Sequence, residues 1–384
     1  MVGSRPVVGM VGGGQLARMT APAAIALGVG LRVLAADELD SAATVVTQPR
    51  IGDYASIKDL RAFAKGCAVL TFDHEHVPSG HLRTLVREGV AVRPGPDALL
   101  HTQDKAVMRA RLARVGVPVP AWRGAGSAEE VAAFGTEHGW PVVLKSVRGG
   151  YDGRGVWVVS GPEDGERLLA GLGGVPLIVE EHVPFRRELA ALVARSPCGQ
   201  AAAYPVVETV QRDGICTEVL APAPRLPAER AVAAQQLALR IAGELEVTGL
   251  LAVELFETFD GGLLVNELAM RPHNSGHWTI DGARTSQFEQ HLRAVLDLPL
   301  GAPTMIAPHA VMANVLGGPD PDVYARYPHV LARDPELKVH MYGKESRPGR
   351  KLGHVTAVGE DVEDLRARAR HAAAYLAGME GETE

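Results

Sequence analysis

The sequence has little cysteine, few aromatic residues and no excess of positive charge, and each scarcity excludes a class of protein. Its three cysteines are widely spaced, which suits neither a disulfide framework nor a cysteine-ligated metal. The net charge of −6 leaves no basic stripe to neutralise the phosphates of a nucleic acid. No apolar run approaches a membrane span, and the N-terminus lacks the layout of a signal peptide. We therefore expect a cytoplasmic α/β enzyme that binds neither nucleic acid nor membrane.

The 384 residues suffice for two or three domains, and the first hundred begin with a βαβ pattern. Strands are predicted over residues 7–11 and 31–36, with a glycine-rich turn and a helix between them. The spacing Gly12-x-Gly14-x-x-Ala17 imitates a dinucleotide fingerprint. A tight turn into a helix N-terminus suits any phosphate or carboxylate, so this motif alone leaves NAD open.

Polar residues also gather at the end of a later strand of this predicted parallel sheet. The strand spans residues 68–72 and is followed by acids and histidines, of which Glu75 is best placed to project toward a ligand. Ligands of open α/β sheets bind outside the carboxyl ends of the strands. A further strand is predicted over residues 90–92, and the first domain should close near residue 100.

A predicted hairpin organises the middle of the chain. Two apolar strands, residues 251–256 and 263–268, flank an Asp-Gly-Gly turn, and each carries one acid, Glu254 and Glu267. A plausible register places both carboxylates on one face, where they repel each other unless a cation lies between them. Hard oxygen ligands suit Mg²⁺ shared with substrate phosphates. The polar run 271–277 follows at once, so we expect a metal–nucleotide site here.

Residues 140–160 add features typical of phosphate binding. Lys145 lies on a strand otherwise built of Val and Leu, and lysine is seldom buried without a partner, so an anionic ligand over the strand is expected. A glycine-rich loop then carries Arg148 and Arg154, whose charges and neighbouring amides can hold phosphates. The helix before this unit is predicted to open at Gln103 and to end near Arg114.

Two more segments point to a nucleotide and to a phosphorylated substrate. A strand is predicted to end at Val179, before Glu180 and Glu181, which suits adenine at the strand edge and a carboxylate on the ribose. Four cations lie from Lys344 to Lys351 among Pro and Gly residues. These cations fit a solvated loop or a site for a phosphorylated substrate.

Taken in order, these motifs resemble the N5-carboxyaminoimidazole ribonucleotide synthase family of ATP-grasp enzymes. The resemblance spans nearly the whole chain, and its most specific parts are Gly-Gly-Tyr-Asp-Gly-Arg-Gly at 149–155 and Arg-Pro-His-Asn-Ser-Gly-His at 271–277. It implies an α/β, three-domain ATP-grasp architecture: a Rossmann-like domain over 1–100, an ATP-grasp core over 101–302 with a mobile lid at about 120–185, and a small β-rich C-terminal domain over 303–384. A homodimer is implied as well.

The implied reaction joins bicarbonate to the exocyclic amine of aminoimidazole ribonucleotide through carboxyphosphate, with ATP converted to ADP and phosphate. The resemblance implies two Mg²⁺ ions on Glu254 and Glu267. Residues that match the family's ATP contacts are Lys105, Lys145, Gly150, Tyr151, Asp152, Gly153, Arg154, Gly155, Val156, Glu180, Glu181, His182, Val183, Glu188, Gln211, Asn266 and Glu267. Residues that match its substrate contacts are Gln15, Glu75, Tyr151, Arg154, Asn274, Lys344 and Arg350, and the expected catalytic residues are Asp152, Arg271, His273 and Lys344. Asp152 is our candidate for the base.

Three departures from the family pattern are visible. Lys105 stands where an arginine is usual, Gln211 replaces a nucleotide-contacting histidine, and Met270 interrupts the usual Ala-Pro-Arg-Pro.

Other enzymes and a regulator fit the sequence less well. Biotin carboxylase is disfavoured because its second metal strand should read Glu-x-Asn, whereas here Ala269 stands two positions after Glu267. A formate-using transformylase would lack the C-terminal cationic motif, a dehydrogenase leaves the hairpin acids unexplained, and a non-catalytic regulator would have lost a ligand that is present here.

Overall fold

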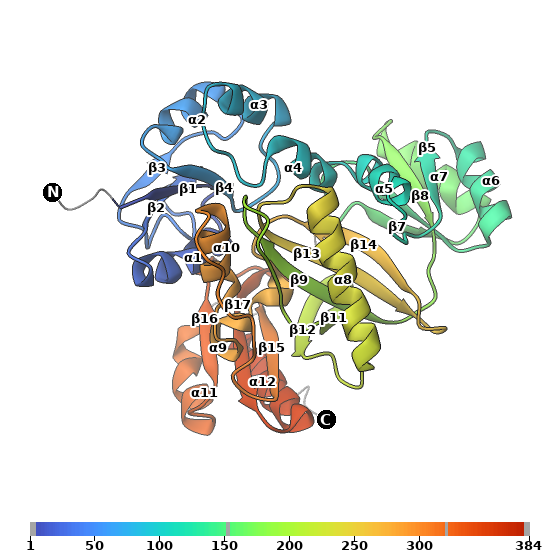
Figure 1. The fold of residues 1–384 in the computed structure, drawn as a ribbon. Helices are drawn as coiled ribbons and strands as arrows, with labels where there is room; N and C mark the ends of the chain where they lie inside the picture. The colour runs from blue at the N-terminus through green and yellow to red at the C-terminus, as the bar shows by residue number, and fades with distance from the viewer. Residues whose placement is uncertain (1–4, 151–153, 319–321, 380–384) are drawn as a thin grey trace.

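Three sheets organise the molecule, and they meet around one cleft. The computed structural model describes residues 5–150, 154–318 and 322–379. A parallel sheet forms the N-terminal part, a small antiparallel sheet projects on the opposite side, and a large antiparallel sheet fills the centre and the C-terminal part (Figure 1). This is the predicted α/β three-part architecture.

The N-terminal sheet has the order β3-β2-β1-β4 and is parallel throughout, as the βαβ pattern predicts. The predicted strand at residues 90–92 is wrong, because only a single bridge between Leu70 and Val92 forms there. The elements of this part are β1 (Val7–Val11), α1 (Gln15–Ala26), β2 (Gly30–Ala35), β3 (Pro49–Ile51), α2 (Ile57–Ala64), β4 (Val69–Phe72), α3 (Ser79–Arg87), α4 (Pro96–Gln103) and α5 (Lys105–Arg114). Helix α5 begins later than predicted because Asp104 caps it, accepting a hydrogen bond from Val107 N at 3.0 Å.

The small antiparallel sheet has the order β5-β8-β6-β7 and packs two helices against one face, burying Val131 and Phe134. Its elements are β5 (Trp122–Ala125), α6 (Ala128–His138), β6 (Val142–Ser146), β7 (Val156–Val159), α7 (Pro162–Leu172) and β8 (Leu177–Glu181). Strand β8 continues through Glu180 and Glu181, beyond the predicted end. This unit makes no strand pairing with the central sheet within the described chain.

The central sheet has the order β14-β13-β9-β11-β12-β15-β17-β16, with β10 paired to β9. Its strands from the middle of the chain are β9 (Phe185–Arg195), β10 (Ala201–Ala203), β11 (Val207–Arg212), β12 (Ile215–Ala221), β13 (Gly249–Thr258) and β14 (Leu263–Ala269). Around them lie α8 (Ala228–Glu244), the 3₁₀ turn η1 (Asn274–Gly276), α9 (Thr279–Gly282) and α10 (Gln287–Val295).

The C-terminal part continues this sheet rather than building its own. Strand β15 pairs with β12 over four residues, from Ala310 opposite Ala221 to Ala313 opposite Glu218. The C-terminal elements are β15 (His309–Leu316), η2 (Tyr324–Arg326), α11 (Tyr327–Arg333), β16 (Lys338–Met341), β17 (Lys351–Gly359) and α12 (Val362–Leu376). One backbone framework therefore carries both the predicted metal hairpin and the predicted C-terminal cations.

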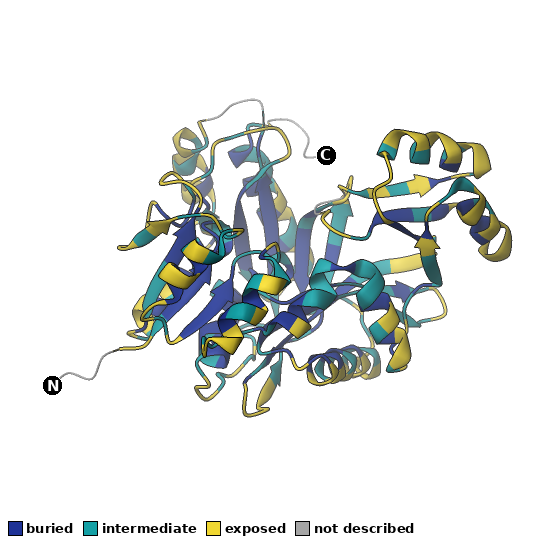
Figure 2. Ribbon diagram, turned by 90° about the horizontal axis from the view of Figure 1, so that it is seen from above, coloured by how far each residue is buried: buried dark blue, intermediate teal, exposed yellow. Residues whose placement is uncertain are grey.

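Period-two alternation decides what each face of the central sheet buries. Leu189, Ala191 and Val193 of β9 pack toward α8, whereas Ala190 and Leu192 face the side that holds Trp278. The strands at the centre are buried and the outer helices carry the exposed residues (Figure 2). Among the described helices, none is long and apolar enough to cross a membrane.

A buried histidine joins the N-terminal sheet to the central sheet. His291 of α10 is fully buried; its Nδ1 accepts a hydrogen bond from Leu250 N at 3.2 Å, which leaves its Nε2 to donate to Thr71 Oγ1 at 2.7 Å. Burial lowers its pKa from 6.5 to about 3. The ring is therefore neutral near pH 7 and ties β4 to β13.

This lowered pKa predicts a loss of stability in acid. Because the folded pKa lies below the unfolded value of 6.5, the stabilisation is complete above pH 6.5 and falls as the pH drops toward 3. As the pH falls, the free energy of unfolding should decrease more steeply in the parent chain than in His291→Gln. The difference in slope should reach at most about 1.4 kcal/mol per pH unit. Urea unfolding between pH 7.5 and 4.5 measures this, with exposed His138→Gln as control. Parallel curves for the parent and His291→Gln would contradict the prediction.

Candidate active site

The two hairpin acids face each other across paired strands. Glu254 on β13 lies directly opposite Glu267 on β14, and both line a large cleft, so the prediction that they share a face is confirmed. The cleft lies between the three sheets and has a volume of about 1390 Å³. Single small-ligand pockets are usually about 300–1,000 Å³, so this cleft has room for two ligands.

An irregularity in the hairpin adds a third polar side chain to the same face. Leu255 pairs with Val265 and Glu254 pairs with Glu267, so Asn266 is an extra residue on β14. A bulge of this kind turns the side chain of the extra residue out of the normal alternation. Asn266 consequently lines the cleft beside Glu267 instead of pointing away from it.

Two lysines converge on this bulge from different elements. Lys105, at the start of α5, donates from Nζ to Glu267 Oε1 at 3.0 Å. Lys145, on β6, donates to Asn266 Oδ1 at 3.0 Å and lies 2.8 Å from Glu180 Oε2. The sequence predicted an anionic ligand as the partner of Lys145, but a buried carboxylate of the chain already holds it. Glu180 is only 2% exposed, so its side chain is taken up by this ion pair, although the residue lines the cleft.

Arg109 holds these parts together, although nothing in the sequence singled it out. Its side chain is 1% exposed and donates to both carboxylate oxygens of Glu180, at 2.6 and 3.2 Å. It also donates to the carbonyls of Val265 and Asn266, both at 2.8 Å, which clamps the bulge. Burial opposes ionisation of Glu180, but Lys145 and Arg109 outweigh it and lower its pKa to about 2. In the sequence Arg109 resembles any other cation of an arginine-rich helix.

The carboxylate pair has the electrostatics of a cation site. Burial, then the charges of Glu267 and Glu188, raises the pKa of Glu254 to about 8. Without a cation, the two acids cannot both ionise readily near pH 7. No group of three or more His, Cys, Asp or Glu side chains in the described ranges is arranged to hold a metal by itself. Glu254 and Glu267 thus fit Mg²⁺ that takes its remaining ligands from substrate phosphates and water.

The polar run after β14 forms the floor of the cleft. Arg271 donates to Glu75 Oε2 at 2.8 Å, which joins the end of β4 to this run. His273 Nε2 lies 3.4 Å from Glu254 Oε1, and burial, with the charges of Arg271 and Lys351, lowers its pKa to about 3. The buried amide of Asn274 lies next to the Cys216 thiol and makes no hydrogen bond of standard geometry within the described chain. Asn274 is one of the residues that line the cleft.

The C-terminal part contributes a further set of cations to the lining of the cleft. Lys344 Nζ donates to Gln15 Oε1 at 2.5 Å, and Arg350 donates to the carbonyl of Glu345 at 3.1 Å. Lys351 also lines the cleft, although it was not among the predicted substrate contacts, which included Arg350 instead. Its charge acts on His273 and Glu254, so it belongs to the same electrostatic unit. The run of cations in the sequence was the signal that could have found it.

The remaining predicted contacts lie along the strand edges of the cleft. Glu188 and Gln211 are hydrogen-bonded, and burial raises the pKa of Glu188 despite that bond. Glu181 accepts a hydrogen bond from Ala121 N at 2.9 Å, which fixes the segment between the small sheet and the core. Tyr151, Asp152 and Gly153 lie outside the described residues. Every other predicted site residue lines the cleft except Gly155, and these are Gln15, Glu75, Lys105, Lys145, Gly150, Arg154, Val156, Glu180, Glu181, His182, Val183, Glu188, Gln211, Glu254, Asn266, Glu267, Arg271, His273, Asn274, Lys344 and Arg350.

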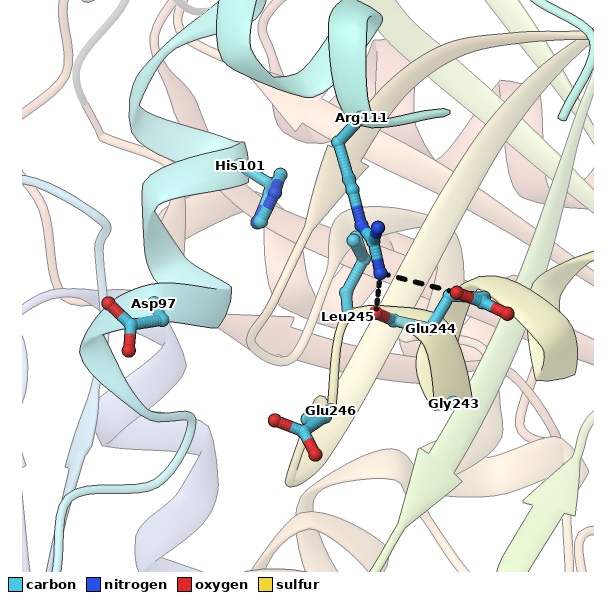
Figure 3. A pocket seen from close by; sticks show the side chains of 7 residues that line it. All are labelled: Asp97, His101, Arg111, Gly243, Glu244, Leu245 and Glu246. Atoms are coloured by element: carbon cyan, nitrogen blue, oxygen red, sulfur yellow. Dashed lines mark hydrogen bonds and ion pairs between the residues drawn. The ribbon is translucent and has the colours of Figure 1, made fainter. Parts of the chain in front are cut away.

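A second cavity, of about 420 Å³, lies apart from these residues between α4, α5 and the end of α8 (Figure 3). Its Arg111 donates to the carbonyl of Glu244 at 2.9 Å and to its carboxylate at 3.2 Å. Asp97, His101 and Glu246 complete a polar rim. It contains neither the bulge at Asn266, nor the two lysines, nor the carboxylate pair of the hairpin, so we assign the chemistry to the larger cleft.

The fold and the cleft define an ATP-grasp enzyme: the model of the ATP-grasp domain matches residues 110–288. The ribonucleotide synthetase preATP-grasp domain matches residues 6–103, and the phosphoribosylaminoimidazole carboxylase C-terminal domain matches residues 310–368. An N5-carboxyaminoimidazole ribonucleotide synthase of Mycobacterium bovis is 58% identical over 376 residues, which are 97% of this chain and 88% of that protein. The chain belongs to the N5-carboxyaminoimidazole ribonucleotide synthase family.

Solved structures of the same enzyme superpose over almost the entire chain. The synthase of Aspergillus clavatus in complex with ATP has a TM-score of 0.90 and 33% identity, covering 98% of this chain and 99% of that one. The Aspergillus clavatus enzyme in complex with ADP and 5-aminoimidazole ribonucleotide has a TM-score of 0.89 and 32% identity, covering 97% and 98%.

The buried position of Arg109 predicts a large effect on stability. Arg109→Met keeps the aliphatic volume but leaves Glu180 without its bidentate partner, so the free energy of unfolding should fall by about 3–5 kcal/mol. Urea unfolding measures it. Arg111→Met on the same helix is the matched control, because its ion pair with Glu244 is half-exposed and should contribute at most about 1 kcal/mol. Equal losses in the two variants would show that Arg109 has no special role.

Proposed function

We propose that the cleft divides its two ligands between its two walls, with ATP on the hairpin side and the ribonucleotide on the C-terminal side. The reaction is the ATP-dependent carboxylation of 5-aminoimidazole ribonucleotide in purine biosynthesis, which yields the N5-carboxy product, ADP and phosphate. The observation that carries this assignment of sides is the arrangement of the charges. Lys105, Lys145 and the carboxylate pair surround the bulge, and a second set of cations that lines the cleft comes from the C-terminal part.

In the first step, an oxygen of bicarbonate attacks the γ-phosphorus of ATP, the bond to the bridging oxygen of ADP breaks, and carboxyphosphate forms. Lys105 and Lys145 hold the phosphates, and backbone groups from Glu180 to Val183 hold the adenine. Glu254 and Glu267 would hold Mg²⁺, with Asn266 beside them. When bound, the metal neutralises negative charge on the transferring phosphoryl group, so the protein has mainly to position the reactants.

In the second step, the exocyclic amine of the ribonucleotide captures the carboxyl carbon and phosphate leaves. Arg271, His273 and Asn274 hold the carboxyl group next to the hairpin; His273 is neutral, so it donates or accepts a hydrogen bond without adding charge. The amine loses a proton, and Asp152 is our candidate base. Gln15, Glu75, Lys344 and Arg350 hold the ribonucleotide.

The proposal includes the wider organisation of the enzyme. Residues 1–100 form the Rossmann-like domain, 101–302 the ATP-grasp core with the unit at about 120–185 as its lid, and 303–384 the C-terminal domain. The separate sheet of the lid supports this division, because no strand pairing ties it to the core within the described chain. A homodimer in the cytoplasm completes the proposal and rests on the family relation.

The test is ADP release from ATP and bicarbonate, with and without aminoimidazole ribonucleotide, alongside direct detection of the carboxylated product. Stoichiometric ADP, phosphate and N5-carboxylated ribonucleotide are expected. Biotin, or a glycinamide ribonucleotide with formate, should not replace the imidazole substrate. Faster turnover with either of these acceptors would overturn the proposal.

The proposed metal ligand Glu267 should be essential for turnover. Glu267→Gln keeps the shape but removes a charge from the cation site, so kcat should fall at least about 100-fold. The fold should persist, because this side chain is 44% exposed. Circular dichroism checks folding, and Glu246→Gln, outside the cleft, is the control. Near-normal turnover of a folded Glu267→Gln protein would remove the hairpin from the mechanism.

Lys344 should act on ribonucleotide binding rather than on chemistry. If Lys344 contacts the substrate phosphate in ground and transition states alike, Lys344→Ala should raise KM for the ribonucleotide by about 10–100-fold and change kcat little. Steady-state kinetics at saturating ATP and bicarbonate measure both. Lys338→Ala, exposed on β16, should keep the parental KM. A loss of kcat with an unchanged KM would move Lys344 to the chemical step.

A further inference from the structure

The N-terminal glycine-rich turn already holds an anion, and that anion belongs to the chain. Asp73 follows strand β4 and points its carboxylate at the start of helix α1. Its Oδ2 accepts a hydrogen bond from Gly14 N at 2.7 Å, and its Oδ1 accepts one from Ala17 N at 2.9 Å. A helix N-terminus favours negative charge through its free amides and its dipole. Asp73 supplies that charge where a nucleotide phosphate would otherwise bind.

The glycine at position 14 is required by space rather than by backbone conformation. Gly14 has φ −81°, which any residue adopts, yet a Cβ there would lie 2.1 Å from Asp73 Oδ2. In a dinucleotide fold the second glycine allows a pyrophosphate to approach the turn. Here the same glycine allows the carboxylate of Asp73 to approach. This explains why the motif imitates the fingerprint in a chain that does not need a dinucleotide.

Two residues that neighbour the Asp73 contact in the sequence reach the substrate side of the cleft. Gln15, directly after Gly14, accepts the hydrogen bond from Lys344 Nζ. Glu75, two residues after Asp73, accepts the one from Arg271. The carbonyls of Glu75 and Val77 are in turn held by Gln103 Nε2, both at 2.8 Å. The two bonds of Asp73 therefore fix the distance between the α1 turn and the loop after β4.

We propose that Asp73 is a positioning residue that replaces a bound phosphate at the glycine-rich turn and thereby aligns Gln15–Lys344 with Glu75–Arg271 for the ribonucleotide. This inference rests on the proposed function. Removing the carboxylate should let the Gln15–Lys344 pair and the Glu75–Arg271 pair move apart. The ATP side should be unaffected, because Lys105 and Lys145 are held by the hairpin bulge and Glu180 rather than by the turn.

The experiment compares steady-state kinetics of the full-length parent with Asp73→Asn and Gly14→Ala. An asparagine side chain at position 73 has one carbonyl oxygen, so it can accept only one of the two backbone hydrogen bonds. A methyl group added at position 14 pushes the carboxylate away from the turn. Both variants should raise KM for aminoimidazole ribonucleotide at least tenfold, with KM for ATP within twofold of the parent. Because either variant tests the same contact, Gly14→Ala decides the outcome if Asp73→Asn does not fold.

Asp361→Asn is the matched control. Asp361 also accepts hydrogen bonds from two helix N-terminal amides, Glu363 N at 2.9 Å and Asp364 N at 3.2 Å, but it caps α12 and does not line the cleft. The Asp361→Asn variant should have a lower melting temperature than the parent and the same KM for the ribonucleotide. A purely structural role for Asp73 predicts the same behaviour in both Asn variants, and that result, or a parental KM in Asp73→Asn, overturns the inference. If the parent itself does not carboxylate the ribonucleotide, the proposed function fails before the variants are compared.

Discussion

The rest of the site depends on the contacts that the buried guanidinium of Arg109 makes. One side chain satisfies Glu180 of the small sheet and two carbonyls of the bulge in the central sheet. Removing the charges of Arg109, Glu180 and Lys145 from water is costly. The arrangement persists only because each charge has partners at hydrogen-bond distance. Lys145 is oriented by the same carboxylate. The nucleotide side of the cleft is thus set from within the protein before any ligand arrives.

The substrate side follows the opposite principle. Its residues come from segments far apart in the chain, and contacts between side chains help to connect them, such as Gln15 to Lys344 and Glu75 to Arg271. These contacts are only partly buried, so each is weaker than the Arg109 network. The two halves of the site consequently differ in stiffness. A rigid half suits phosphoryl transfer, in which positioning is most of the catalysis.

The sequence predicts most of the fold and much of the site. The Asp260 turn and the placement of Glu254 and Glu267 sufficed to predict the hairpin and its shared face, because period-two alternation leaves few registers. The bulge at Asn266 could not be foreseen, since one extra residue in a strand leaves no mark in its composition. Arg109 was missed because Arg111 and Arg114 look the same in the sequence. What separates them is the depth at which each side chain lies, which only packing decides.

The pairing of β12 with β15 has a consequence for how this enzyme can be divided. The C-terminal part looks like a separate domain in the sequence, yet its strands complete a sheet that begins in the core. Cutting the chain between them would leave β12 as an open edge, with unpaired amides and carbonyls ready to pair with another molecule. The C-terminal part is therefore not a portable module. Chimaeras that exchange it between relatives must preserve the β12–β15 seam, or they will aggregate.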